Sequence, residues 1–393
     1  MKYAIEARRP SAAQGPIRPF LPILAGVITT DHAPGFASLG QPAARRMATR
    51  GFATGRIGHS ILVHGPAGAG KDAFVDDLLA LVHCTDEDPS RRPCNACRGC
   101  RDARGRSHPD LVIGSPDRWR ESRSTGESIV AAARRWLLAA AGAPIVADRR
   151  VILIERADQA SEQIQNALLK ALEEPTDRHT FILVADDPSR LLPTIRSRCQ
   201  PMRIGPVPLA ELRDHLMDVE RLPEDQAVAL ARISGGLAGT AISYARDGQL
   251  LAWRRRTQLQ LTSLLERGRA DRFASVRDLI DEAAAFVPAR GEDEEAPTPA
   301  SVQRQAALSV VNAWIGLSRD LLVAAAGRPE LTPSAELAAE LGDVGRRIGV
   351  APLRRMLAHL ERVHAGLGEN AAPRLALESA MLQWPMLPAA GDR

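Results

Sequence analysis

The chain has 393 residues, of which 45% are apolar, so it is long enough for roughly two to three domains with cores of their own. Its 51 basic and 47 acidic residues leave a net charge of +4, and aromatic residues make up 4%, which argues against a strongly basic protein that stacks nucleic-acid bases. No apolar run approaches the roughly 20 residues of a membrane span. The short run Phe20–Val27 lacks the cleavage site of a signal peptide.

The first 33 residues mix Pro, Gly, Arg and Ala without periodicity, and we expect a flexible tail there. Ala43–Thr54 predicts a helix and His59–Val63 a buried strand. A glycine-rich segment then leads into a helix near Lys71, and this helix carries an apolar stripe that should pack on a sheet.

This strand, loop and helix have the form of a P-loop, in which backbone amides surround phosphates. The expected phosphate-binding residues are Gly65, Gly68, Gly70 and Lys71. The next position normally holds Ser or Thr for Mg²⁺, but here it is Asp72, whose carboxylate repels phosphates. We therefore expect weak or no ATP binding. A chance glycine-rich turn is the alternative.

Four cysteines follow in the spacing C-x9-C-x2-C-x2-C, and they are Cys84, Cys94, Cys97 and Cys100. Four thiolates in such turns can surround Zn²⁺, and because they fill all four positions the site would be structural. The alternatives are an iron–sulfur cluster and an incidental or redox-active group of thiols. We interpret the nearby His83 and His108 as bystanders. Clustered cysteines of this kind favour a reducing compartment, hence a cytoplasmic location.

Asp110–Gly114 predicts a second strand, residues 115–126 a polar surface loop, and Ser128–Ala141 a helix. Val151–Ile154 predicts the strand that ends in a Walker B motif. There an active ATPase needs an Asp for Mg²⁺ and a Glu that polarises water, but this chain has Glu155 and Arg156. Arginine cannot act as a general base at neutral pH.

Ser161–Glu174 predicts an amphipathic helix that ends before Pro175, and Phe181–Val184 predicts the next strand. Ser197-Arg198-Cys199 follows. On its own, Arg198 would be interpreted as half of a surface ion pair.

From Pro206 onward the pattern is helical. Three short helices, within Leu209–Glu220, Pro223–Ile233 and Leu237–Ala245, predict a small bundle. Residues 287–300 predict a disordered or extended loop. We expect the remaining helices at Leu250–Arg267, Phe273–Phe286, Val302–Ala326, Ser334–Ile348, Pro352–Leu367 and Ala371–Leu382.

Several motifs in residues 35–245 together resemble the bacterial clamp-loader AAA+ proteins. These motifs are Leu39-Gly40-Gln41, the P-loop with its four cysteines, His108-Pro109-Asp110, Asn166–Lys170, Leu172–Pro175, and Ile195 with Ser197-Arg198-Cys199. The resemblance implies an α/β fold in which an AAA+ P-loop domain with a parallel sheet is followed by a small helical lid and an all-α C-terminal domain. The corresponding boundaries are a tail at 1–33, a P-loop domain at 34–205 with a zinc-binding insert at 84–100, a lid at 206–248 and a helical collar at 249–393.

The family contains motor subunits of the gamma/tau type, which hydrolyse ATP, and delta-prime stators, which have lost turnover. Four departures on one reaction path imply the stator: Asp72, the pair Glu155-Arg156, the pair Ala185-Asp186 at the sensor after the next strand, and Gly239 in the second-sensor helix. The intact Ser197-Arg198-Cys199 implies that Arg198 serves as an arginine finger in a neighbour's ATP site.

The implied role is a non-hydrolysing subunit that helps load a sliding clamp onto DNA. Its implied partners are the gamma/tau and delta subunits, the clamp, and primer–template DNA through the assembled complex. One alternative is an active gamma/tau-like ATPase in which Asp72 and Glu155 together hold the metal. Another is a zinc-dependent nucleic-acid-binding module on an inert P-loop scaffold, suggested by Arg98, Arg101, Arg104 and Arg106.

Overall fold

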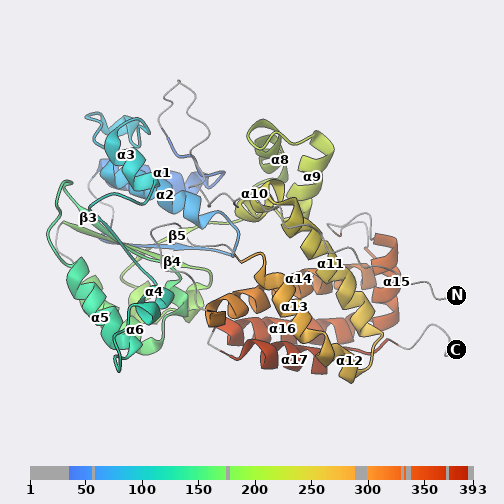
Figure 1. Cartoon of the computed structure of the whole chain (residues 1–393). Coiled ribbons are helices and arrows are strands. Elements are labelled where there is room, and N and C mark those ends of the chain that lie inside the picture. The colour runs from blue at the N-terminus through green and yellow to red at the C-terminus, as the bar shows by residue number, and fades with distance from the viewer. Residues whose placement is uncertain are drawn as a thin grey trace, which may run out of the picture.

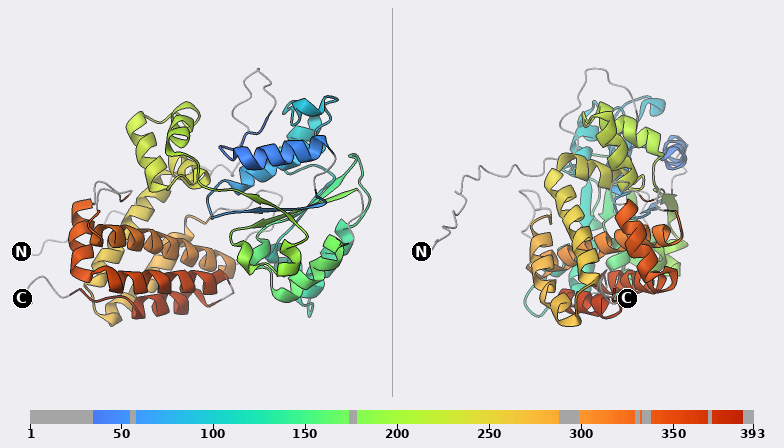
Figure 2. Two further views of the ribbon diagram at one scale, coloured as in Figure 1. Left: turned by 180° about the vertical axis from the view of Figure 1, so that it is seen from behind. Right: turned by 90° about the vertical axis from the view of Figure 1, so that its right-hand side faces the viewer.

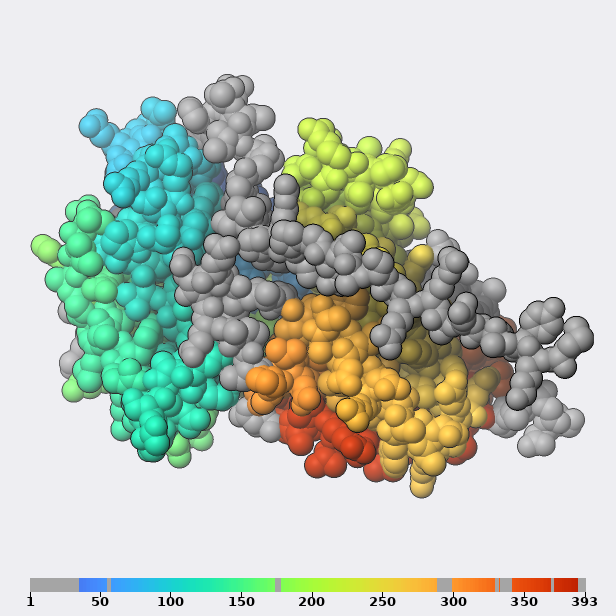
Figure 3. Space-filling model, viewed as in Figure 1, coloured from blue at the N-terminus to red at the C-terminus, as the bar shows by residue number. Residues whose placement is uncertain are grey.

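The computed structural model describes residues 35–54, 58–173, 178–287, 299–328, 332, 338–368 and 371–387. An α/β lobe, a small bundle of three helices and a larger helical lobe follow one another along the chain (Figure 1). They form distinct parts of the surface in the space-filling view (Figure 3). The predicted tail 1–33 and Pro175 lie outside the described residues.

The α/β lobe is built on a parallel five-stranded sheet in the order β2-β3-β4-β1-β5. Its strands are β1 (Ser60–His64), β2 (Leu111–Gly114), β3 (Arg150–Ile154), β4 (His179–Ala185) and β5 (Gln200–Arg203). The register pairs Leu62 with Leu183 and Ile152 with Phe181. Both faces of the sheet are covered by helices, so the central strands are apolar on both sides.

Alternation along β1 divides the core of the lobe into two layers. Ile61 and Val63 face α1 (Pro42–Ala53) and α2 (Lys71–His83), whereas Leu62 belongs to the opposite layer. That second layer is formed by α4 (Pro116–Glu121), α5 (Ile129–Ala140) and α6 (Glu162–Glu173). The remaining short elements are η1 (Pro89–Arg91), α3 (Arg98–Arg104), η2 (Ala157–Gln159), η3 (Pro188–Arg190) and α7 (Pro193–Arg196).

The lid comprises α8 (Leu209–Asp218), α9 (Glu224–Ile233) and α10 (Ala238–Arg246), close to the predicted bundle. Its core is separate from that of the sheet and centres on Leu212, Leu216 and Ala241. The N-terminal end of α10 touches the P-loop, because the Thr240 amide donates a hydrogen bond to the carbonyl of Gly68 at 3.1 Å.

Seven helices of the described chain form the C-terminal helical lobe, for which we keep the name collar: α11 (Gly248–Leu265), α12 (Arg269–Ala274), α13 (Val276–Ala284), α14 (Pro299–Ala325), α15 (Ala338–Ile348), α16 (Val350–Gly368) and α17 (Pro373–Leu382). The front and back views agree that α14 and α16 run toward the α/β lobe (Figure 2). By length and composition α14 could cross a membrane, but 61% of its most apolar window is buried in the chain. Its Trp314 and Leu321 are part of the collar core.

Three expectations need correction. Residues 115–126 are not all loop, because Ser115 accepts the Arg118 amide, Pro116 starts α4, and Trp119 is fully buried beneath it. The predicted helix 273–286 is interrupted at Ser275, between α12 and α13. Part of the loop predicted at 287–300 is helical, since α14 begins at Pro299, and residues 288–298 lie outside the described part.

Candidate functional site: an occupied P-loop

The P-loop joins β1 to α2, as the sequence predicts, and its glycines permit a close backbone path. A Cβ atom on Gly65 would lie 1.8 Å from the carbonyl oxygen of Ile204. Gly68 has φ +76°, and a Cβ there would meet the Thr240 hydroxyl at 2.0 Å. Gly70, at φ +91°, precedes the first residue of α2. The loop therefore has the tight glycine-dependent form that brings backbone amides around an anion.

The lysine of this loop is engaged by the chain itself. Lys71 is 8% exposed, and its Nζ donates to the carbonyls of Gly65 and Pro66 at 2.9 Å each. Nζ also lies 2.5 Å from Oδ1 of Asp186, which follows β4 at the first-sensor position. A carboxylate of the chain thus pairs with the amine that a P-loop offers to nucleotide phosphates.

Asp186 is itself held by the turn after β3. Oδ2 of the buried Asp158 accepts the amides of Asp186 and Asp187 at 3.1 and 2.9 Å. Burial raises the pKa of Asp158, against the effect of the Asp187 amide. The loop that carries Asp186 is therefore fixed at its start, and its carboxylate stays beside Lys71.

A second cation of the chain sits between the two residues that would hold a metal. The Arg106 guanidinium lies 3.8 Å from Oδ1 of Asp72 and 2.5 Å from Oε1 of Glu155. Its Nε is 2.9 Å from Oδ1 of Asp76, whose pKa burial raises to about 6 despite Arg106. Although burial opposes it, Asp76 and Glu155 raise the pKa of Arg106. The alternative in which Asp72 and Glu155 share a metal would require both carboxylates to exchange the Arg106 guanidinium for the metal ion.

Arg156, the second residue of the degenerate Walker B pair, points elsewhere. It adopts φ +49° and pairs with Oδ2 of Asp117 on α4 at 2.7 Å. At the second-sensor position, a Cβ on Gly239 would already be 3.0 Å from the carbonyl of Gly68. The lid therefore contacts the P-loop through backbone at this position.

Arg198 lies apart from this cluster, just after α7. Its Nη2 is 2.7 Å from Oε1 of Glu173, Nη1 donates to the carbonyl of Thr194 at 2.9 Å, and 35% of its side chain is exposed. The next residue, Cys199, is buried in the core, and burial raises the pKa of its thiol to about 11. Cys199 thus anchors the turn that holds Arg198 at the surface.

The four clustered cysteines converge as the sequence predicts. The sulfurs of Cys84, Cys94, Cys97 and Cys100 all lie within 4.8 Å of one another, and no disulfide joins them. They accept amide hydrogen bonds, including those from Cys94 to Cys84 Sγ at 3.4 Å and from Cys100 to Cys97 Sγ at 3.3 Å. Although burial opposes it, amides of Thr85 and Cys100 lower the pKa of the Cys97 thiol to about 6.

Four soft donors around one point fit Zn²⁺ and leave no coordination position for water, so a zinc ion here would act structurally. His83 and His108 lie beside the cluster but stack on each other, with ring centroids 3.8 Å apart. Burial lowers the pKa of His83 to about 4. Their stacking agrees with the bystander interpretation.

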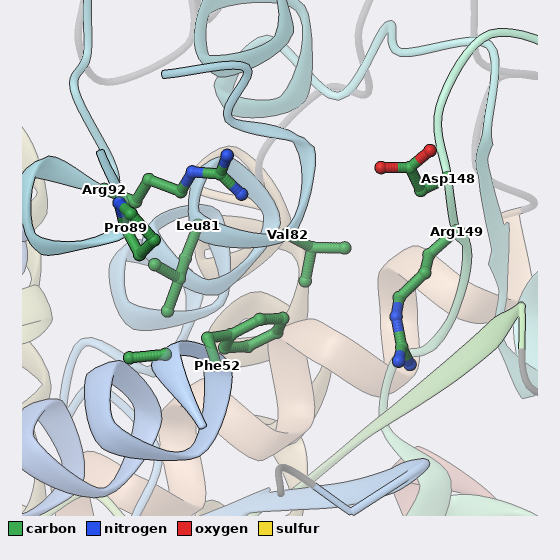
Figure 4. Close-up of a pocket in the computed structure, with 8 residues that line it drawn as sticks. Phe52, Leu81, Val82, Pro89, Arg92, Asp148 and Arg149 are labelled. Atoms are coloured by element: carbon green, nitrogen blue, oxygen red, sulfur yellow. The ribbon is translucent and has the colours of Figure 1, made fainter. Parts of the chain in front are cut away.

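Sequence reasoning missed the role of Arg106 and grouped it with three other arginines as a basic patch. Arg106 and Arg104 instead face carboxylates of α2, and Arg98 pairs with Asp102 at 3.1 Å. The ion pairs of these three arginines weaken the case for a nucleic-acid-binding surface around the cysteines. A pocket nearby is lined by Phe52, Ala53, Leu81, Val82, Pro89, Arg92, Asp148 and Arg149, none of which is a predicted site residue (Figure 4).

The parallel sheet, the P-loop between β1 and α2, and the helical lid together have the fold of an AAA+ protein. Residues 40–208 match the family described as "DNA polymerase III, delta subunit". Over these residues the chain is similar to subunits delta' of DNA polymerase III.

The chain is 32% identical over 192 residues to a DNA polymerase III subunit delta' of Pseudomonas aeruginosa, which is 47% of this chain and 54% of that protein. It is 29% identical over 361 residues to a DNA polymerase III subunit gamma/tau of Mycobacterium tuberculosis, which is 86% of this chain and 58% of that protein. The chain thus spans little more than half of these two relatives. It is also similar to a solved DNA polymerase III gamma-subunit-related protein of Thermotoga maritima, with 16% identity, a TM-score of 0.40, and coverage of 86% of this chain and 97% of that one.

Proposed function

We propose that this chain is a non-hydrolysing delta-prime stator of a DNA polymerase III clamp loader. One observation carries the proposal: the chain's own charged groups fill its nucleotide site, while Arg198 stays at the surface. Lys71 is paired with Asp186, and Arg106 lies between Asp72 and Glu155. ATP would have to displace both interactions and approach two carboxylates, which opposes binding electrostatically.

In this proposal Arg198 leaves Glu173 when subunits assemble and reaches the ATP of a neighbouring gamma/tau subunit. A guanidinium there stabilises the charge that develops on the transferred phosphoryl group. The partners are the gamma/tau and delta subunits, with the sliding clamp and primer–template DNA engaged by the assembled loader. The proposed location is the cytoplasm, and Zn²⁺ held by the four cysteines is structural.

Arg198→Ala tests this role in a loader reconstituted from the gamma/tau and delta subunits of the same source. Hydrolysis at the one neighbouring site should slow by about a thousandfold, the scale of an arginine finger. The steady-state ATPase rate of the loader then falls by the fraction that this one site contributes. The mass of the complex stays unchanged, which shows that the subunits still assemble. Arg196→Ala, an exposed arginine two residues earlier, is the matched control. Unchanged ATPase in a correctly assembled Arg198→Ala complex would refute the finger.

The second candidate is an active gamma/tau-like ATPase, favoured by the similarity to a gamma/tau subunit over 86% of this chain. This candidate function requires that the purified chain alone hydrolyses ATP and that Lys71→Ala abolishes the hydrolysis. The stator proposal expects no such turnover.

A further inference from the structure

The segment before α1, residues 35–41, is attached to the cysteine insert, and we call it the strap. The Gly35 amide donates to the carbonyl of Pro93 at 3.1 Å, and Asn95 Nδ2 donates to the carbonyl of Gly35 at 2.9 Å. Pro93 and Asn95 flank Cys94, so the sulfur cluster fixes the part of the insert that receives the start of the strap.

A buried carboxylate makes the second attachment. Asp77 of α2 is fully buried, and its two oxygens accept the amides of Ala37 and Ser38 at 2.8 and 2.7 Å. Arg104 of α3 pairs with the same carboxylate at 2.6 Å. Arg104 also donates to Oδ1 of Asn95 from Nε at 3.0 Å and from Nη2 at 2.8 Å. One guanidinium therefore joins the insert to the carboxylate that holds the strap, through charge-assisted hydrogen bonds.

The far end of the strap is fastened to the lid. Gln41 Nε2 donates to the carbonyl of Gly205 at 2.8 Å, and the Gly205 amide donates back to Gln41 Oε1 at 3.1 Å. Gly205 lies between β5 and α8, where the chain leaves the sheet for the lid. Leu39 packs on the lid core, and Gly40, at φ +66°, lies so close to Val207 that a Cβ would be 3.1 Å from its Cγ2.

We propose that the zinc insert holds the lid in position. The insert fixes the strap, and the strap fixes the hinge at Gly205 and so the position of the lid over the P-loop. Figure 1 shows α3 and the lid on the same side of the sheet, at its two ends. The zinc site thereby supports the contact between α10 and Gly68. None of the four cysteine ligands takes part in that contact. This role is independent of nucleotide turnover and of Arg198.

Hydrogen exchange of the full-length chain tests this role of the zinc insert. The exchange rates are measured in peptides that cover the strap and residues 203–208. Removing zinc with a chelator should speed exchange in both regions by about tenfold, because each buried charge-assisted bond that is lost weakens local protection. Arg104→Met should do the same while the chain keeps one zinc. Gln41→Ala should speed exchange at residues 203–208 and leave the Ala37 and Ser38 amides protected.

Arg101→Met, an exposed residue of the same helix, is the matched control and should leave both regions unchanged. Protection in β4 checks that the sheet remains folded in every sample. The proposal is wrong if zinc removal speeds exchange only within the insert and Arg104→Met leaves the strap and the hinge at wild-type rates.

Discussion

At the scale of residues, the P-loop shows how an intramolecular charge can replace a ligand. Lys71 is nearly buried, so without a counterion its ammonium group would lose solvation with little compensation. Asp186 and two P-loop carbonyls supply that compensation. The loop can therefore keep a tight conformation with no phosphate present.

Asp186→Asn should increase the affinity of the isolated chain for ATP by about tenfold. The substitution removes an ion pair that competes for Lys71 and a negative charge that repels phosphates, effects of about 1 kcal/mol at a half-exposed position. Titration calorimetry without added metal measures the change. Asp187→Asn is the control, because that carboxylate accepts from Ser189 instead. Equal affinities in the three proteins would show that Asp186 does not block the site.

The glycines, cysteines and Arg198 were predictable from sequence because each belongs to a motif with fixed local spacing. Arg106 was not, since its three carboxylate partners come from α2 and from the end of β3. Only the packing of α2 beside β3 brings those charges together. A sequence pattern records that Asp72 and Glu155 are unusual, but not that one guanidinium joins them.

At the scale of elements, helices with a clear apolar stripe were predicted within a few residues, as α6 and the three lid helices illustrate. Helix α4 was missed because it has only six residues and four charged side chains interrupt its apolar pattern. Ser115 followed by Pro116 was the available signal, since an N-cap serine before a proline starts many helices. The break at Ser275 depends on packing against α17 and has no comparable local signal.

Asp320 of α14 gives the collar a pH-dependent stability. Burial raises its pKa to about 6, against the attraction of Arg254 on α11. A raised folded-state pKa contributes stability below the unfolded value of 3.8, and this contribution is lost as the pH rises through 6. Relative to Asp320→Asn, the wild-type chain should therefore lose about 2 kcal/mol of unfolding free energy between pH 4 and pH 7.

Urea unfolding of the two proteins at each pH measures the difference, in which effects of acid on the cysteine site cancel. Asp343→Asn, at an exposed carboxylate of α15, should follow the wild-type profile. A constant difference between wild type and Asp320→Asn from pH 4 to pH 7 would contradict the assignment.

At the scale of the whole molecule, the chain has separate cores. The collar cluster shares no residue with the two layers of the sheet or with the lid. The lobes meet at the C-terminal end of α16, where a Cβ on Gly368 would lie 2.7 Å from Arg190 Nη1. Arg304 of α14 also interacts electrostatically with Asp117 and Arg120 of α4. His364 also lies near Asp186. Burial lowers the pKa of His364, and the Asp186 carboxylate offsets part of this effect. Separate cores with a limited junction favour separate unfolding.

Calorimetry should therefore resolve two transitions that respond to different substitutions. Cys97→Ser removes a zinc ligand and should lower only the α/β transition, because a structural zinc contributes directly to folding. Arg272→Met should lower only the collar transition. Arg272 is 1% exposed and donates to carbonyls at the ends of α11 and α17, including Leu264 at 2.8 Å and Pro385 at 3.1 Å. Its loss leaves those carbonyls unpaired at a cost of about 3 kcal/mol, or roughly 10 °C in the collar Tm.

Arg269→Met, on the exposed side of the same helix, should leave both transitions in place. Strong coupling between the lobes through Arg190 at the α16 junction would merge the two transitions. A single transition that Cys97→Ser and Arg272→Met lower alike would mean that the sheet and the collar unfold as one unit. The collar would then be an extension of the α/β lobe, and loss of the strap's hold on the lid would also disturb the collar.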